Sequence, residues 1–184
     1  MSVKEKRRGR PQGDKRQLSE QVILTQAKAL MTGDGKMPSI RKLAAQLGVD
    51  AMAIYYYFAN KDALQEAIAV SLIEEIYQPN LADPWRDELT ALCQSYVLLL
   101  HRHSGLLETL LKMKSDSPAM VFIERFNAIL EPLKIDSAKS TNAIHLLADY
   151  LHGFVLALNC QPDSELNIEM LNGPLEFYYS ALQS

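Results

Sequence analysis

The chain has 184 residues and a formal net charge of −3, which suits one or two globular domains with a substantial core. Its longest wholly apolar runs, such as Val97 to Leu100, are only a few residues long. We therefore expect no membrane-spanning segment and no secretory signal. Cys93 and Cys160 lack metal-ligand spacing and are expected to be buried thiols of a soluble, cytoplasmic protein.

The charge is unevenly distributed along the chain. Residues 1–62 contain 12 of the 19 basic side chains and 6 of the 22 acidic ones, so this part carries +6 and the remainder −9. A basic end joined to an acidic body indicates that the first part faces a polyanion. The negative total therefore does not argue against DNA binding.

Residues 1–17 are basic and lack apolar periodicity, which predicts a disordered arm. Arg7, Arg8 and Arg10 surround a glycine and precede a proline, a composition suited to a narrow minor groove. The alternative is a solvated basic tail that raises DNA affinity without sequence preference. The composition favours this alternative.

Three short helices are predicted in the first third of the chain. Ser19 is placed to cap the first, which Gly33 and Gly35 end. The second has apolar residues at i, i+3, i+4 and i+7, namely Ile40, Leu43, Ala44 and Leu47. Gly48 follows where a left-handed residue commonly ends a helix, and Asp50 is placed to cap the third helix. This is the sequence form of a helix-turn-helix, whose second helix enters the DNA major groove.

The remaining residues predict further helices. Asn60 is placed to cap a fourth helix that reaches to about Tyr77. Later helices are expected at about 84–101, 105–111, 118–133, 137–160 and 165–182, with the last split at Gly173-Pro174. There is no alternating strand pattern. The predicted fold class is all-α, with about nine helices.

The helix-turn-helix residues resemble the DNA-binding signature of the tetracycline-repressor (TetR) family. The matching residues are Arg41-Lys42-Leu43-Ala44, Leu47-Gly48-Val49, Ile54-Tyr55, Tyr57-Phe58 and Asn60-Lys61-Asp62-Ala63-Leu64. The resemblance implies a helix-turn-helix DNA-binding domain over residues 18–62 and an effector-binding and dimerisation domain over residues 63–184.

The predicted recognition helix, Ala51 to Tyr57, contains no Arg, Asn, Gln or Lys, the residues that make most bidentate base contacts. Ala51, Met52 and Ala53 offer apolar contacts that suit thymine methyl groups, so thymine-rich half-sites are expected.

The resemblance adds further candidate contacts. Tyr55, Tyr56 and Lys61 match positions that commonly touch phosphates, and Arg41 matches one that can reach a base. Tyr57 and Phe58 are expected in the core, since they lie on the side that faces the preceding helix.

The resemblance also implies a homodimer that binds a palindromic operator in double-stranded DNA. The helices at about 137–160 and 165–182 would form its four-helix interface, with candidate residues Leu146, Tyr150, Phe154, Leu158, Phe177 and Tyr178. A pocket for an unknown small-molecule effector would lie among the helices at about 84–103, 104–113, 118–133 and 137–160. Candidate polar anchors are Tyr96, His101, His103, Asn127, His145, Asp149, His152 and Asn159.

His145, Asp149 and His152 share one helix face, at i, i+4 and i+7. They could form a metal site, but a polar stripe at the pocket wall or dimer interface is favoured, and no cofactor is expected. The tetracycline repressor holds a magnesium–drug complex through a histidine shortly after a His-Arg pair. The corresponding residues here, Leu106 to Thr109, contain no histidine, so tetracycline is not the expected effector.

The sequence is compared with three kinds of function: a ligand-responsive repressor, a DNA-binding protein without an effector, and an enzyme. A repressor released from its operator by a small-molecule effector is favoured. The alternative is a helix-turn-helix protein without an effector that recruits a protein partner. An enzyme is not expected, because no nucleophile–base motif, glycine-rich phosphate loop or HExxH helix is present.

Overall fold

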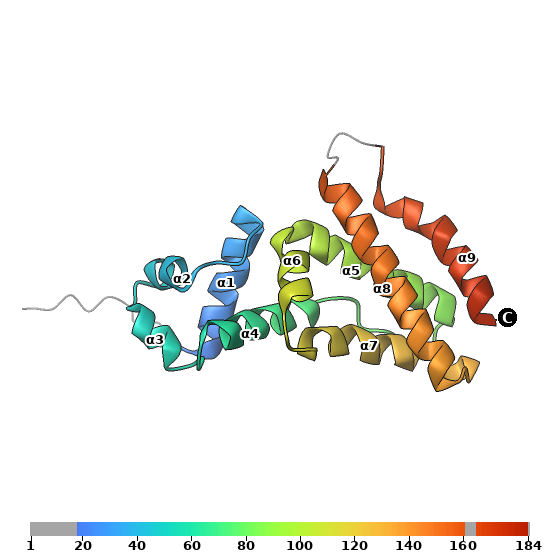
Figure 1. Ribbon diagram of the computed structural model, residues 1–184, viewed down its shortest axis with the longest axis horizontal. Coiled ribbons are helices and arrows are strands. Elements are labelled where there is room, and N and C mark those ends of the chain that lie inside the picture. The colour runs from blue at the N-terminus through green and yellow to red at the C-terminus, as the bar shows by residue number, and fades with distance from the viewer. Residues whose placement is uncertain (1–17, 161–164, 184) are drawn as a thin grey trace, which may run out of the picture.

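The computed structural model describes residues 18–160 and 165–183. Within these ranges the chain forms nine α-helices, two short 3-10 helices and no strand, which confirms the all-α prediction (Figure 1). The predicted arm, with Arg7, Arg8 and Arg10, lies outside the described residues.

Four helices form the N-terminal part: α1 (Glu20–Asp34), α2 (Ile40–Leu47), α3 (Ala51–Tyr55) and α4 (Lys61–Ile73). The predicted caps are present, because Ser19 and Asn60 each accept a hydrogen bond from a backbone N–H in the first turn of α1 and α4. Gly35 ends α1 with φ of 67°. Gly33, also expected to end it, lies inside the helix, since only Gly35 adopts the left-handed conformation.

Seven elements follow: α5 (Trp85–Arg102), α6 (Gly105–Lys112), α7 (Ser117–Leu130), the 3-10 helix η1 (Glu131–Leu133), α8 (Ser137–Cys160), the 3-10 helix η2 (Ile168–Leu171) and α9 (Asn172–Gln183). Helix α5 contacts α7, α8 and α9, so it lies at the centre of this part. Gly173 and Pro174 do not split the last helix. They lie in the first turn of α9, where proline is tolerated because its missing N–H is not needed.

Helix α4 connects the two parts of the molecule. It contacts α1 on the N-terminal side and α5, α6 and α7 on the other (Figure 1). It ends at Ile73 rather than near Tyr77, because the N–H of Ile76 bonds to the Ile73 carbonyl only three residues earlier, at 3.1 Å. Arg125 of α7 then donates to the Ile76 carbonyl at 2.7 Å, which anchors this end of α4 to the C-terminal part.

A second connection joins the α1–α2 loop to the start of α6. The N–H of Gly105 donates to the Gly35 carbonyl at 2.5 Å, and the Ser104 hydroxyl donates to the same oxygen at 3.3 Å. A Cβ on Gly105 would lie 2.5 Å from that oxygen and 3.0 Å from Cα of Lys36. The two backbones approach so closely that only glycine fits at this position.

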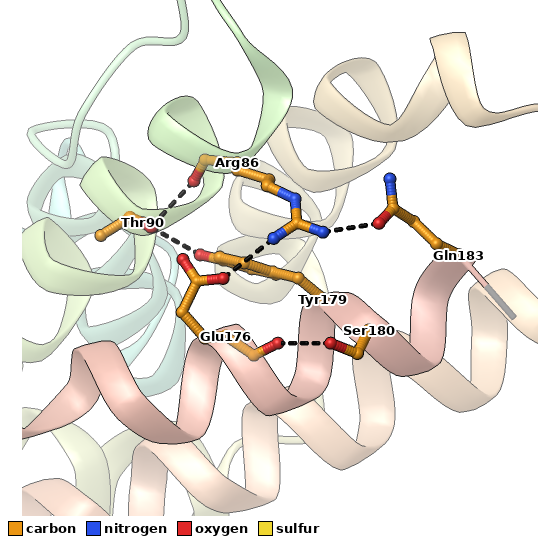
Figure 2. Close-up of polar contacts among 6 residues, drawn as sticks. All are labelled: Arg86, Thr90, Glu176, Tyr179, Ser180 and Gln183. Carbon is orange, nitrogen blue, oxygen red and sulfur yellow. Dashed lines mark hydrogen bonds and ion pairs between the residues drawn. The ribbon is translucent and has the colours of Figure 1, made fainter.

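Polar contacts hold α9 against the start of α5 (Figure 2). Arg86 donates to Glu176 at 2.9 Å and to Gln183 at 2.5 Å. The fully buried Tyr179 shares a hydrogen bond with the Thr90 hydroxyl, with 2.6 Å between the oxygens. The last helix is therefore attached to the body by both ion pairing and buried hydrogen bonding.

Helix α8 is long and apolar enough, by length and composition, to cross a membrane, with a mean hydropathy of 1.3, which the short apolar runs did not suggest. Its apolar residues lie on two faces. Leu147, Leu151 and Val155 are buried in the bundle, whereas Leu146 and Leu156 are exposed. Two apolar faces on a packed helix account for the high hydropathy.

Candidate nucleic-acid interface

The turn between α2 and α3 sets the direction of the candidate recognition helix. Gly48 adopts φ of 66°, and its N–H bonds to the Ala45 carbonyl at 3.2 Å, a conformation that is easy for glycine. Asp50 then accepts a hydrogen bond from the Met52 N–H at 2.8 Å. Helix α3 therefore begins with a capped turn directly after the glycine.

Helix α3 presents one side to the core and the other to solvent. Ile54 is fully buried, whereas Met52 is 71% exposed and Tyr56, just after the helix, is 87% exposed. The remaining predicted contact residues here, Ala51, Ala53 and Tyr55, are less exposed. The outward side is thus apolar and aromatic, as its sequence predicted.

Tyr57 is not a core residue, contrary to expectation, although Phe58 is buried as expected. The Tyr57 ring stays at the surface because its hydroxyl donates to the Leu18 carbonyl, just before α1, at 2.5 Å. Its ring also meets the Tyr56 ring edge-on, with the centroids 5.4 Å apart. Tyr57 therefore connects the end of the helix-turn-helix to the residue just before α1 and packs against the exposed Tyr56 ring.

The predicted basic contacts on α2 and α4 are exposed. Arg41 lies on α2, and Lys61 lies in the first turn of α4, where backbone N–H groups favour phosphate. Lys42 differs from both, because it forms an ion pair with Asp34 at the end of α1. Arg41 and Lys61 are accordingly better placed than Lys42 to meet DNA.

In the C-terminal part, two predicted pocket residues meet between α5 and α8. The Tyr96 hydroxyl and His152 Nε2 lie 2.9 Å apart, and the Tyr96 ring packs on Phe122 of α7. Burial raises the pKa of Tyr96. Burial also lowers the pKa of His152, and the negative charge of Asp149 offsets part of that decrease. The pair is therefore held as a neutral hydrogen bond inside the bundle.

The other predicted pocket residues are dispersed. His101 Nδ1 lies 2.7 Å from Asn159 Oδ1 on an exposed part of α5 and α8. Asn127 accepts a hydrogen bond from the Ser140 hydroxyl at 3.1 Å. His103 is buried at the α5–α6 junction, and within residues 18–160 and 165–183 its Nδ1 has no hydrogen-bond partner.

The candidate metal ligands do not converge. His145 and Asp149 are exposed, whereas His152 is half-buried and faces Tyr96. Among the residues that the structure describes, no group of three or more His, Cys, Asp or Glu side chains could hold a metal ion.

Neither of two clefts on the described part of the chain lies among α5, α7 and α8. One, of about 490 Å³, lies between the N-terminal part and α6 with the loop that follows it. The other lies between residues 74–81 and α7. None of the predicted pocket residues lines either cleft. The sequence did not reveal the lysines of the first cleft, Lys36, Lys112 and Lys114, because they share no periodicity and meet only in the folded chain.

Acidification is expected to destabilise the protein through the imidazoles of His103 and His152, because burial disfavours their protonated forms. Burial lowers the pKa of His103 and of His152. As the pH falls through the unfolded pKa of about 6.5, the unfolded chain gains protons that the folded chain does not, so the free energy of unfolding falls. His103→Gln should make this fall smaller in urea unfolding curves recorded between about pH 7 and pH 5. His145→Gln, on an exposed ring, is the control, and an equal effect of both changes would contradict the assignment.

Both parts of the chain match known family profiles. The profile of bacterial regulatory proteins of the tetR family matches residues 23–68, from α1 into α4. The profile of the tetracyclin repressor-like C-terminal domain matches residues 78–170, from before α5 into η2.

Two curated relatives are similar over parts of the chain. Tetracycline repressor protein class A from transposon 1721 of Escherichia coli is 39% identical over 67 residues, which are 34% of this chain and 31% of that protein. HTH-type transcriptional repressor DrrR1 of Streptomyces coeruleorubidus is 26% identical over 134 residues, which are 69% of this chain and 48% of that protein. The chain thus matches less than half the length of either relative.

Solved structures share the fold. The crystal structure of BioQ with its double-stranded DNA operator has a TM-score of 0.73 and 19% identity, and the match covers 91% of this chain and 99% of that chain. Streptomyces coelicolor ActR in complex with actinorhodin has a TM-score of 0.74 and 18% identity, covering 91% and 96%. At these identities the likeness concerns the fold.

Proposed function

Because this chain belongs to the TetR family of bacterial regulatory proteins, we propose that it is a dimeric, sequence-specific transcriptional repressor that a small-molecule effector releases from its operator. The observation that carries the proposal is the outward face of α3, with Met52 and Tyr56 exposed while Ile54 anchors the helix. The operator in the BioQ structure and the ligand in the ActR structure support it. We place it in the cytoplasm, as a soluble DNA-binding protein that is not an enzyme.

DNA contacts divide into two kinds in this proposal. Met52, with Ala51 and Ala53, reads thymine methyl groups in the major groove. Tyr55, Tyr56 and Lys61 bind phosphates and fix the register. Arg41 is the one cation on α2 with no ion pair among the described residues, and it reaches a base edge or phosphate beside the helix.

The homodimer would form through the outer faces of α8 and α9. Leu146 is 64% exposed and Phe177 is 82% exposed. Large apolar side chains that remain exposed on packed helices are typical of an interaction surface. Of the other candidates, Phe154 and Tyr178 are buried within the subunit, and the Tyr178 hydroxyl donates to the Ala143 carbonyl at 2.9 Å. These two aromatic residues therefore belong to the core of one chain, while Leu146 and Phe177 remain candidates for the interface.

A structural change caused by effector binding would be transmitted to the DNA-binding helices through two connections between the parts. Helix α4 joins them along its length, and the Gly105–Gly35 hydrogen bond joins α6 to the α1–α2 loop. An effector that displaces α5, α6 or α7 would change the separation of the two recognition helices in the dimer. The coupling expected of such a switch is about 1–3 kcal/mol.

The experiment that tests the proposal is selection from a random pool of DNA duplexes at near-physiological salt, followed by sequencing. An enriched palindrome with half-sites about 34–36 Å apart is the expected result. Measurable binding without any enriched sequence would contradict a sequence-specific reader and would leave only phosphate contacts.

Met52→Ala is expected to relax sequence specificity by about 1 kcal/mol or slightly more, because the side chain that contacts the thymine methyl group is shortened. Selection with the variant should give less information at one position of each half-site. Met120→Ala, also exposed but on α7, is the control. An identical sequence logo for all three proteins would exclude Met52 from base contact.

Deleting residues 1–16 is expected to flatten the salt dependence of DNA binding, since the seven cations of this segment would no longer release counterions. The measurement is the slope of log affinity against log salt for the two proteins on one duplex. Replacing only Arg7, Arg8 and Arg10 by Gln separates these arginines from the other cations. A slope unchanged by the deletion would exclude the arm from contact.

A further inference from the structure

We propose that the cleft between the two parts of the molecule is a binding site for a small organic dianion, such as a dicarboxylate or a phosphorylated carboxylate. The cleft has a volume of about 490 Å³, within the range of small-molecule sites of about 300–1,000 Å³. One wall comes from the α1–α2 loop and the start of α4, and the other comes from α6 and the loop after it.

Lysines stand on both walls of this cleft. Lys36 and Lys61 belong to the first wall, and Lys112 and Lys114 to the second. Lys112 is paired with Glu108 on its own helix at 2.5 Å. The other three form no ion pair in the part of the chain that the structure describes. Lysine side chains therefore bring positive charge to the cleft from both walls.

The acidic residues of the cleft cancel only part of this charge. The Glu66 carboxylate accepts a hydrogen bond from the Ser115 hydroxyl at 2.5 Å, and Glu108 forms an ion pair with Lys112. Of the three carboxylates that line the cleft, only that of Asp62 has no hydrogen bond or ion pair to another described residue. Four lysines against three carboxylates leave the lining with a net positive charge, which favours an anion.

The rest of the lining favours an organic body between the charged ends. Met37 and Met113 are half-buried and come from opposite walls. Thioether side chains adapt to ligands of irregular shape, and the Gln65 amide adds both donors and an acceptor. An apolar centre with an anionic group at each end fits this arrangement better than a compact inorganic ion does.

The position of the site gives it a regulatory consequence, which rests on the function proposed above. The cleft lies at the Gly105–Gly35 contact and includes Lys61, a candidate phosphate contact. A bound dianion would neutralise Lys61 and clamp α4 against α6. Operator affinity would fall for both reasons.

The test uses terephthalate as the probe, with the uncharged terephthalamide as its matched control. Methyl NMR spectra of the methionines report where the probe binds, since Met37 and Met113 line the cleft while Met120 and Met170 do not. Saturable shifts at the first two signals with terephthalate alone are the expected result. Absence of these shifts at millimolar probe, equal shifts with the amide, or shifts confined to other methionines would overturn the proposal.

Lysine variants test whether the lysines of the cleft bind terephthalate. Lys36→Ala combined with Lys114→Ala should weaken terephthalate binding by about tenfold, since each removes one exposed charge contact. Lys139→Ala, at the start of α8, should leave the affinity unchanged. Equal affinity in the double variant would overturn the lysine assignment. Operator selection is performed without terephthalate, so its failure would count against the DNA-binding function alone. The NMR result would still decide whether the cleft binds the probe.

Discussion

Ile54→Ala is expected to lower the free energy of unfolding by about 2–5 kcal/mol and to abolish specific operator binding. Ile54 is fully buried and is the only buried residue of α3, so it anchors the helix to α2 and to the hydrophobic core. A five-residue helix has little stability of its own. Loss of the anchor should therefore disorder the DNA-contacting face while the C-terminal part persists.

Urea unfolding and fluorescence anisotropy with the selected operator are the measurements for this variant. Met52→Ala is the matched control on the same helix, because its side chain is 71% exposed and its stability should change by less than about 0.5 kcal/mol. Retention of operator affinity and stability by Ile54→Ala would show that α3 is held by other contacts.

Gly105→Ala is expected to cost about 1–3 kcal/mol of stability and to change the preferred spacing of the operator half-sites. The new Cβ would lie 2.5 Å from the Gly35 carbonyl oxygen and 3.0 Å from Cα of Lys36. Both are backbone atoms, so no flexible side chain can move aside. The α1–α2 loop must separate from α6, and the hydrogen bond between Gly105 and Gly35 must break.

The readout that distinguishes coupling from simple destabilisation is the preferred spacing of the half-sites in operator selection, which depends on how the N-terminal part is held. Gly33→Ala is the control, since nothing lies within 4 Å of its Cβ and it sits inside α1. It should stabilise the protein by about 0.5–1 kcal/mol. A normal spacing and normal stability in Gly105→Ala would refute the role of this contact.

Local signals in the sequence predicted most helix starts and the form of the DNA-binding motif. Ser19, Asp50 and Asn60 cap the helices expected of them, because capping is decided within four residues. Gly48 adopts the left-handed conformation expected after α2. The exposure of Met52 beside the burial of Ile54 likewise follows from helical periodicity alone.

Contacts between distant residues could not be predicted in this way. Periodicity predicted that Tyr57 lies in the core. Its ring lies at the surface instead, because its hydroxyl donates to the carbonyl of Leu18, 39 residues away in the sequence. Helical periodicity could not tell whether Tyr178 faces its own core or another subunit, since both surroundings are apolar. The lysines of the interdomain cleft and the Gly35–Gly105 contact depend on how α6 meets the α1–α2 loop, which no local pattern encodes.

Helix α4 also determines how the chain folds. It packs against α1 on one side and against α5, α6 and α7 on the other, and the buried residues of both parts form one continuous cluster. Neither part keeps a complete core if α4 is removed from it. Thermal melting should thus be a single cooperative transition, and a fragment that ends at residue 62 lacks the helix on which its own packing depends.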